Sequence, residues 1–229
     1  MKAAILQSNY IPWKGYFDII GKVDLFIFHD DLQYTKGDWR NRNKIKTSNG
    51  AEWLTIPCGS SEKRLICEVQ LNDPTWQKKH WNRIVASYQK ANFFNDYRSL
   101  LESFYLDRKW DNLSDFNQSF IKTISSEVFG FKTVFEDSRK YNLKLSKADR
   151  VIELLQKAKV TSYLSGPSAK NYISDKEFEE NEISIEWMDY SGYKPYNQLY
   201  GDFIHEVTVL DLLFNEGKQA INFLKSNAK

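Results

Sequence analysis

The sequence predicts an α/β fold built on a parallel sheet, because short apolar segments alternate with segments of helical spacing. Ala3 to Leu6 is a strand candidate, and Tyr16 to Ile20 follows with helical spacing that stops at Gly21. Leu25 to Phe28 is then a continuous apolar run, which is typical of a parallel strand covered on both faces. This order of strand, helix and strand is that of an α/β unit.

The middle of the chain is predicted to change from strands to helices. Two strand candidates come first, at Trp53 to Ile56 and Ile66 to Leu71. Asp73 then supplies an N-cap and Pro74 a first-turn proline for a helix. Three helices are expected in succession: Pro74 to about Ala91, Tyr97 to Leu106, and Leu113 to Val128 before Gly130. We therefore expect one domain over residues 1–229 with a helical insertion at about residues 74–130.

The last part of the chain returns to alternating strands and helices. Two serines each stand three residues before an acidic residue, in the pattern of a capping box: Ser146 with Asp149, and Ser174 with Glu177. The elements expected here are a helix at Val151 to Ala158, strands at Tyr163 to Leu164 and Ile183 to Met188, and a helix at Val207 to Phe214 that ends at Gly217.

Composition excludes several classes of function. The chain has 32 basic and 30 acidic residues, so bulk charge does not indicate DNA binding. Cys58 and Cys67 are its two cysteines and form no CxxC pair, so neither a zinc site nor a disulfide framework is indicated. There is no run of about 18 apolar residues, so we expect no membrane insertion and a cytoplasmic location.

The segment from Gln7 to Lys46 is the strongest candidate for a ligand site, because it mixes charges, asparagines and aromatics without a regular period. Asp30 and Asp31 directly follow the apolar run, so we expect them at the carboxyl end of a strand. Arginines and lysines after them could hold a diphosphate, although a run of charge is also typical of a solvated surface. The binding residues predicted here are Gln7, Asn9, Tyr10, Trp13, Lys36, Trp39, Arg40, Arg42 and Asn43, with Lys44 and Lys46 as further cations.

A second loop, Ser165 to Tyr172, follows a short strand and could present backbone N–H groups and a lysine to phosphate. An ordinary turn is an equally good interpretation of its composition. The residues predicted to bind are Ser165, Gly166, Ser168, Lys170 and Asn171.

No nucleophile motif is present, since GxSxG, P-loop, GxGxxG and HExxH patterns are all absent. Three side chains remain as catalytic candidates. Asp30 and Asp31 could orient an amine or bind a divalent cation, or form a solvated turn. His80 has basic and aromatic neighbours, although an isolated histidine is more often structural.

Several motifs together resemble the WbqC-like family along nearly the whole chain. They are QSNYIPWKGYFDII, DDLQYTKGDWRNRNKIKTSNG, WLTIP, KHW, YLSGPSAKNY and LDLLFNEG. The resemblance implies a place in the synthesis of O-antigen or another bacterial surface polysaccharide.

A remoter resemblance, to pantothenate synthetase and related nucleotidyltransferases, implies a Rossmann-like parallel sheet core. On that analogy Pro12 to Tyr16 would hold a nucleotide and Ser165 to Asn171 its phosphates. This chain departs from that pattern, because Trp13 and Tyr16 stand where those enzymes have two histidines. Neither side chain can stabilise a phosphate as an imidazole does.

We therefore expect an enzyme that transfers an acyl or aminoacyl group to the amine of a nucleotide-linked amino sugar. Tyr10, Trp13 and Trp39 would stack on rings, and Asp30, Asp31 or His80 would accept the amine proton. The donor would be a thioester, an ATP-derived acyl adenylate or an aminoacyl carrier. The alternatives are a non-catalytic module that binds sugar nucleotides or proteins, and a metal-dependent glycosyltransferase.

Overall fold

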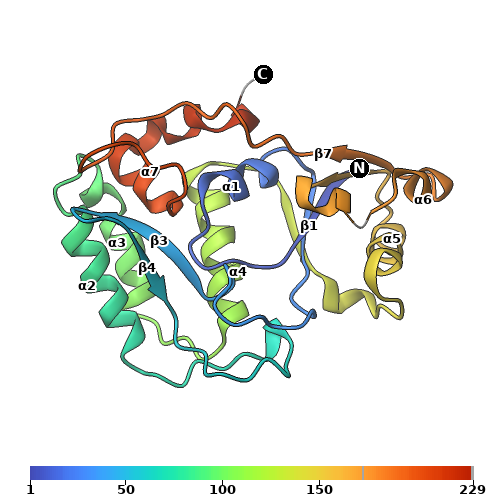
Figure 1. The fold of residues 1–229 in the computed structure, drawn as a ribbon, viewed down its shortest axis with the longest axis horizontal. Helices are drawn as coiled ribbons and strands as arrows, with labels where there is room; N and C mark the ends of the chain where they lie inside the picture. The colour runs from blue at the N-terminus through green and yellow to red at the C-terminus, as the bar shows by residue number, and fades with distance from the viewer. Residues whose placement is uncertain (172, 228–229) are drawn as a thin grey trace.

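The structure, a computed structural model, describes residues 1–171 and 173–227, so Tyr172 of the second loop lies outside it (Figure 1). Within these residues a five-stranded sheet has the order β5-β2-β1-β6-β7, with every neighbouring pair parallel. The strands are β1 (Lys2–Leu6), β2 (Leu25–Phe28), β5 (Val134–Asp137), β6 (Ser162–Ser165) and β7 (Ser184–Trp187). The strand order reverses between β1 and β6, as in Rossmann-like folds. The predicted α/β class is confirmed.

Apolar side chains are buried on both faces of this sheet. Along β2, Phe26 and Phe28 belong to one hydrophobic core, whereas Leu25 and Ile27 belong to the other. Helices cover the two faces: α1 (Lys14–Ile20) and α4 (Leu113–Thr123) on one side, α5 (Lys147–Lys157) and α6 (Asp175–Glu180) on the other (Figure 1). This double coverage explains why β2 reads as a continuous apolar run.

A second, smaller sheet is an antiparallel hairpin of β3 (Arg42–Thr47) and β4 (Gly50–Thr55). It packs in the helical half of the molecule, with α2 (Trp76–Tyr88), α3 (Phe94–Tyr105) and α7 (Val209–Glu216) nearby (Figure 1). Interpreting residues up to Lys46 as an irregular loop was therefore wrong. The strand was hidden because Asn43 and Lys46, which are polar, occupy two of its buried positions.

Two further expectations need correction. Ile66 to Leu71 is not a strand, because it forms a short 3-10 turn, Ile66–Glu68, and a single isolated bridge from Gln70 to Asn112. The edge strand β5 was missed, since it has only four residues and its Val134 is exposed. The other helices lie close to their predicted positions, although α2 begins at Trp76 and not at Pro74. Ser146 and Ser174 precede helices as predicted, but their side chains make no capping hydrogen bond.

An irregular segment, residues 188–208, connects β7 to α7, and we call it the strap. It passes along the top of the view in Figure 1. The strap is hydrogen-bonded to α1 and to the hairpin. Lys14 Nζ of α1 donates to Lys194 O (3.2 Å), and Lys46 Nζ of β3 donates to Gln198 Oε1 (2.9 Å). Over the described residues, no helix combines the length and the apolar character that crossing a membrane requires.

Candidate functional site

A cavity of about 520 Å3 opens between the loop after β1, the β3-β4 hairpin and the end of the strap. Three tryptophans, Trp13, Trp39 and Trp53, give it its aromatic walls, and we call it the tryptophan cavity. Its volume lies in the range of sites that enclose small organic ligands. The charged residues of its lining are Asp38, Arg42, Lys44 and Glu206, and its amide side chains are Asn9 and Asn43.

The loop after β1 is held against the hairpin by a buried asparagine. Asn43 Nδ2 donates to Tyr10 O (3.1 Å) and Ile11 O (2.9 Å). Ile11 has a φ of 35°, which is unfavourable for a β-branched residue. Such a conformation persists only where neighbouring bonds enforce it, and it is found most often at functional sites. Asn43 therefore shapes the cavity chiefly by fixing the loop that carries Asn9 and Trp13.

Trp13 is fixed by aromatic neighbours and by a glycine. Its ring meets Tyr190 and Tyr193 of the strap edge-on, with centroids 5.3 and 5.8 Å away. A Cβ atom on Gly15 would lie 2.3 Å from Trp13 Cζ2, so the ring occupies the space that any larger residue at position 15 would need.

We expect Gly15→Ala to displace Trp13 and to lower the free energy of unfolding by about 1 kcal/mol, the lower end of the usual cost of overpacking. Urea unfolding followed by tryptophan fluorescence measures both effects. Gly166→Ala is the matched control, because a Cβ at Gly166 meets nothing within 4 Å and its φ is not positive. Equal midpoints for the two variants would contradict the packing role of Gly15.

The cavity contains one cation that no carboxylate balances. Asp38 pairs with Arg40 (3.0 Å), and Glu206 pairs with Lys44 (3.3 Å). Among the described residues Arg42 has no ion pair; its guanidinium lies 4.2 Å from the Trp53 ring centroid, and its buried Nε has no hydrogen-bond partner. A buried donor without a partner is uncommon in folded proteins. The Arg42 guanidinium is therefore available to bind an anionic group of a ligand.

The mouth of the cavity carries two exposed aromatic rings. Trp39 and Trp53 are 41% and 36% exposed, and their ring centroids are 5.4 Å apart. Tryptophans are usually buried to a greater degree, and neighbouring exposed rings are typical of surfaces that bind flat or ring-shaped ligands.

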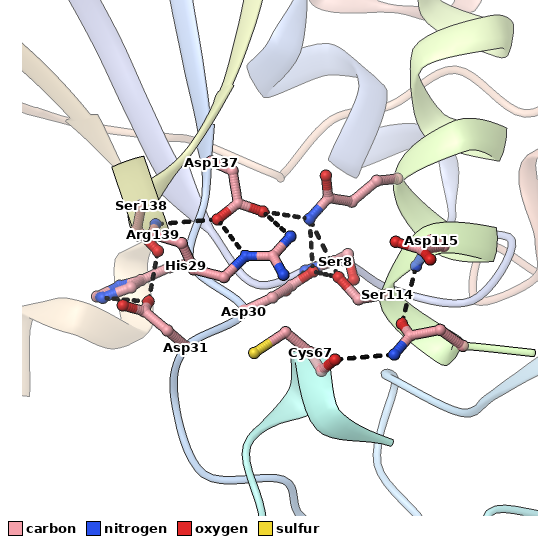
Figure 2. A network of polar contacts seen from close by, with 12 residues as sticks. Ser8, His29, Asp30, Asp31, Cys67, Ser114, Asp115, Asp137, Ser138 and Arg139 are labelled. Carbon is pink, nitrogen blue, oxygen red and sulfur yellow. Dashed lines mark hydrogen bonds and ion pairs between the residues drawn. The ribbon is translucent and has the colours of Figure 1, made fainter. Parts of the chain in front are cut away.

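A second polar site lies at the carboxyl ends of β2 and β5, and we call it the strand-end cluster (Figure 2). Its acidic members are Asp30, Asp31 and Asp137. Asp30 is fully buried and accepts hydrogen bonds from Ser8 N (2.7 Å), from Gln118 Nε2 (3.0 Å) and from the Ser114 hydroxyl. Burial raises the pKa of Asp30, and these hydrogen bonds oppose the increase.

The other carboxylates of the cluster are paired with arginines. Asp31 accepts from Arg150 and from the Ser138 hydroxyl, and Asp137 accepts from Arg139 Nε (2.8 Å). Arg150 Nε also donates to His29 Nε2 (3.1 Å), which makes that nitrogen the acceptor of a neutral ring. Burial lowers the pKa of His29 to about 4, in agreement with the neutral form.

Both sites fall within a region that is shared with known proteins. The model of the WbqC-like protein family matches residues 7–223. The chain belongs to this family. It is also 43% identical, over 98% of its own length and 97% of the relative's, to a protein of Mycobacterium tuberculosis (strain ATCC 25618 / H37Rv) named "Uncharacterized protein Rv1507c". No solved structure matches the chain.

His80, the third catalytic candidate of this WbqC-like protein, lies inside the helical half and does not line the cavity. Its Nε2 donates to Thr55 O (3.1 Å), so its Nδ1 accepts from the Tyr10 hydroxyl (2.7 Å). The Tyr105 hydroxyl in turn bonds to that of Tyr10 (2.7 Å). Burial lowers the pKa of His80 to about 4, so the ring is a neutral link in a buried chain of hydrogen bonds.

The second predicted loop forms a 3-10 turn, Pro167–Asn171, after β6. Lys170 Nζ lies 5.3 Å from the Trp187 ring centroid, beside a separate open cavity near the end of β7. The loop leaves the carboxyl end of β6, the strand that pairs with β1 where the strand order reverses. The loop does not line the tryptophan cavity.

The structure thus brings together only part of the predicted binding set. The predicted residues that line the tryptophan cavity are Asn9, Trp13, Trp39, Arg42 and Asn43, together with the further cation Lys44. The other further cation, Lys46, lies outside the lining. Those outside its lining are Gln7, Tyr10, Lys36, Arg40, Ser165, Gly166, Ser168, Lys170 and Asn171, together with Asp30, Asp31 and His80. Sequence reasoning missed Trp53 and Glu206. Trp53 could have been found by pairing the two strands, since it stands opposite Lys44, but Glu206 had no local signal.

Metal binding gains no support from side-chain grouping. In residues 1–171 and 173–227, no three His, Cys, Asp or Glu side chains are grouped so that they could hold a metal ion. The carboxylates of Asp30 and Asp31, which a metal-dependent glycosyltransferase would use, already accept hydrogen bonds from protein donors.

Proposed function

We propose that this protein binds a nucleotide-linked amino sugar in the tryptophan cavity and transfers an acyl or aminoacyl group to its amine, in the cytoplasmic synthesis of a surface polysaccharide such as O-antigen. The observation that carries the proposal is Arg42, an arginine without a carboxylate partner among the described residues, in a cavity walled by three tryptophans. A planar guanidinium suits a diphosphate, and tryptophan faces suit a base or a sugar ring.

The proposed reaction forms one bond and breaks another. The amine nitrogen of the sugar attacks the acyl carbon of the donor, a C–N bond forms, and the C–S bond of a thioester or the C–O bond of an acyl adenylate or aminoacyl ester breaks. An ammonium group must first lose one proton to become the nucleophilic amine. As the amide forms, the nitrogen loses a second proton to a base, and the thiolate, AMP or alkoxide of the donor departs as the leaving group. For Asp30, Asp31 or His80 to be that base, one of the hydrogen bonds described above would have to open. The side chain would also have to reach the amine, because none of the three lines the cavity.

A non-catalytic sugar-nucleotide module is the second candidate. It is favoured because these three side chains are hydrogen-bonded within the protein and none of them lines the cavity. Incubation of the protein with a nucleotide-linked amino sugar and each donor class, followed by mass spectrometry of the sugar, separates the two. An N-acylated product supports transfer, whereas binding without product supports the module.

Arg42→Ala is expected to weaken the binding of a nucleoside diphosphate at least about tenfold, because a charge-assisted bond to phosphate is lost. Isothermal titration calorimetry with UDP, dTDP, GDP and CDP measures it. Arg98→Ala is the matched control, since Arg98 is an exposed arginine of α3 paired with Glu102. Arg40→Ala should have a smaller effect than Arg42→Ala, because Arg40 lies outside the cavity lining. Unchanged affinity in Arg42→Ala would reject the phosphate assignment.

A further inference from the structure

The charges of the tryptophan cavity are not spread evenly. Arg42 and Lys44 project from β3 beside Trp53, whereas Glu206 comes from the strap, a distant part of the chain. The end of the strap is tied to β3 by Thr208 N, which donates to Lys44 O (2.9 Å). The backbone beside Glu206 is therefore anchored to β3, which places a carboxylate in a cavity whose other wall attracts anions.

The two carboxylates of the lining differ in their capacity for a ligand. Asp38 Oδ1 accepts from Trp39 N (2.6 Å), and its Oδ2 pairs with Arg40. Glu206 has one partner among the described residues, Lys44 at 3.3 Å, and its side chain is 75% exposed. Lys44 Nζ also lies 5.3 Å from the Trp53 ring centroid, so it keeps a favourable contact if Glu206 turns to another cation.

From this arrangement we infer that Glu206 recognises the free ammonium group of the bound sugar, so that the cavity prefers an unacylated amino sugar to its N-acylated counterpart. The inference rests on the function proposed above and specifies its substrate. An amide carries no charge, so it can donate a hydrogen bond to Glu206 but cannot form an ion pair with it. Acylation would therefore lower the affinity of the cavity for the product, and charge complementarity would make the cavity selective for the substrate over the product.

The test compares UDP, UDP-glucosamine and UDP-N-acetylglucosamine by calorimetry at a pH where the amine is protonated, with dTDP or GDP equivalents if another base binds better. The wild-type protein should bind the free amine about fivefold more tightly than the N-acetyl form, as expected for one solvent-exposed ion pair. Glu206→Gln should abolish this preference without weakening the binding of the nucleoside diphosphate, because it removes a negative charge from the cavity lining.

Two further variants make the test specific. Glu180→Gln removes an exposed carboxylate of α6 and should keep the preference. Lys44→Gln removes the present partner of Glu206 and should keep or increase the preference, because the carboxylate is then freed. A preference that persists in Glu206→Gln, or that is absent in the wild type although UDP binds, overturns the inference alone. Failure of every nucleoside diphosphate to bind the wild type overturns the proposed function and the inference with it.

Discussion

Asp30→Ala is expected to lower the free energy of unfolding by about 3 kcal/mol, the largest stability effect that we predict for a polar residue. The substitution leaves two buried donors, Ser8 N and the Ser114 hydroxyl, without their acceptor, and it removes one of the three acceptors of Gln118 Nε2. Each unsatisfied buried group costs about 1–3 kcal/mol, and relaxation recovers part of the sum. Urea unfolding measures the loss, with Asp111→Ala as the control, because the Asp111 carboxylate is exposed and pairs only with Lys109.

Asp30→Asn distinguishes a structural from a catalytic role. Asparagine keeps the shape and one acceptor, so we expect a smaller loss of stability than with alanine. Burial raises the folded-state pKa of Asp30 above 3.8, so at pH values between 3.8 and the folded-state pKa the folded wild type binds more protons than the unfolded chain. The wild type therefore loses stability as the pH rises between these two values. The asparagine variant should lack this contribution. If it folds, binds a sugar nucleotide and remains active, Asp30 is a clamp between β1, β2 and α4 and not a base.

The sequence was most informative where a strand or helix is covered by apolar neighbours. β2 was predicted at its observed bounds because all four of its residues are buried and apolar. Of the hairpin, β4 was predicted in part, as Trp53 to Ile56, but β3 was not. The reason is that β3 buries Asn43 and Lys46, whose polar groups are hydrogen-bonded to the loop after β1 and to the strap. A pattern of hydrophobicity cannot show a strand whose inward side chains are polar.

The candidate site was predicted in part for a related reason. Asn9 and Trp13 on one loop, and Trp39 and Arg42 at the start of the hairpin, are close in sequence and converge in space. Arg40 and Arg42 look equivalent in the sequence, yet Arg40 pairs with Asp38 and only Arg42 lines the cavity. Glu206 reaches the cavity through the irregular strap, and no local rule predicts where such a segment returns.

Lys14→Met is expected to raise the free energy of unfolding by about 2 kcal/mol at neutral pH, because it replaces a buried ammonium by an apolar group of similar length. Lys14 is 3% exposed and lies beneath strap rings, 5.0 Å from the Tyr193 centroid and 5.1 Å from that of Tyr196. Its ammonium group has three N–H donors, and within the described residues it makes one hydrogen bond, to Lys194 O. Burial lowers its pKa to about 8 despite the nearby Asp18 and Asp211.

The pH dependence gives this prediction its sharpest test. Between about pH 8 and 10.5 the unfolded chain holds the Lys14 proton and the folded chain releases it, so wild-type stability gains a contribution that rises with pH in this window. Lys14→Met lacks that contribution, so its advantage should be constant below pH 8 and shrink above it. Urea unfolding at pH 7 and pH 9.5 is sufficient, since tyrosine ionisation affects both proteins alike. An advantage independent of pH would mean that folded Lys14 keeps its proton up to pH 9.5, so that burial does not lower its pKa. A loss of stability would mean that its contacts with the strap outweigh its desolvation.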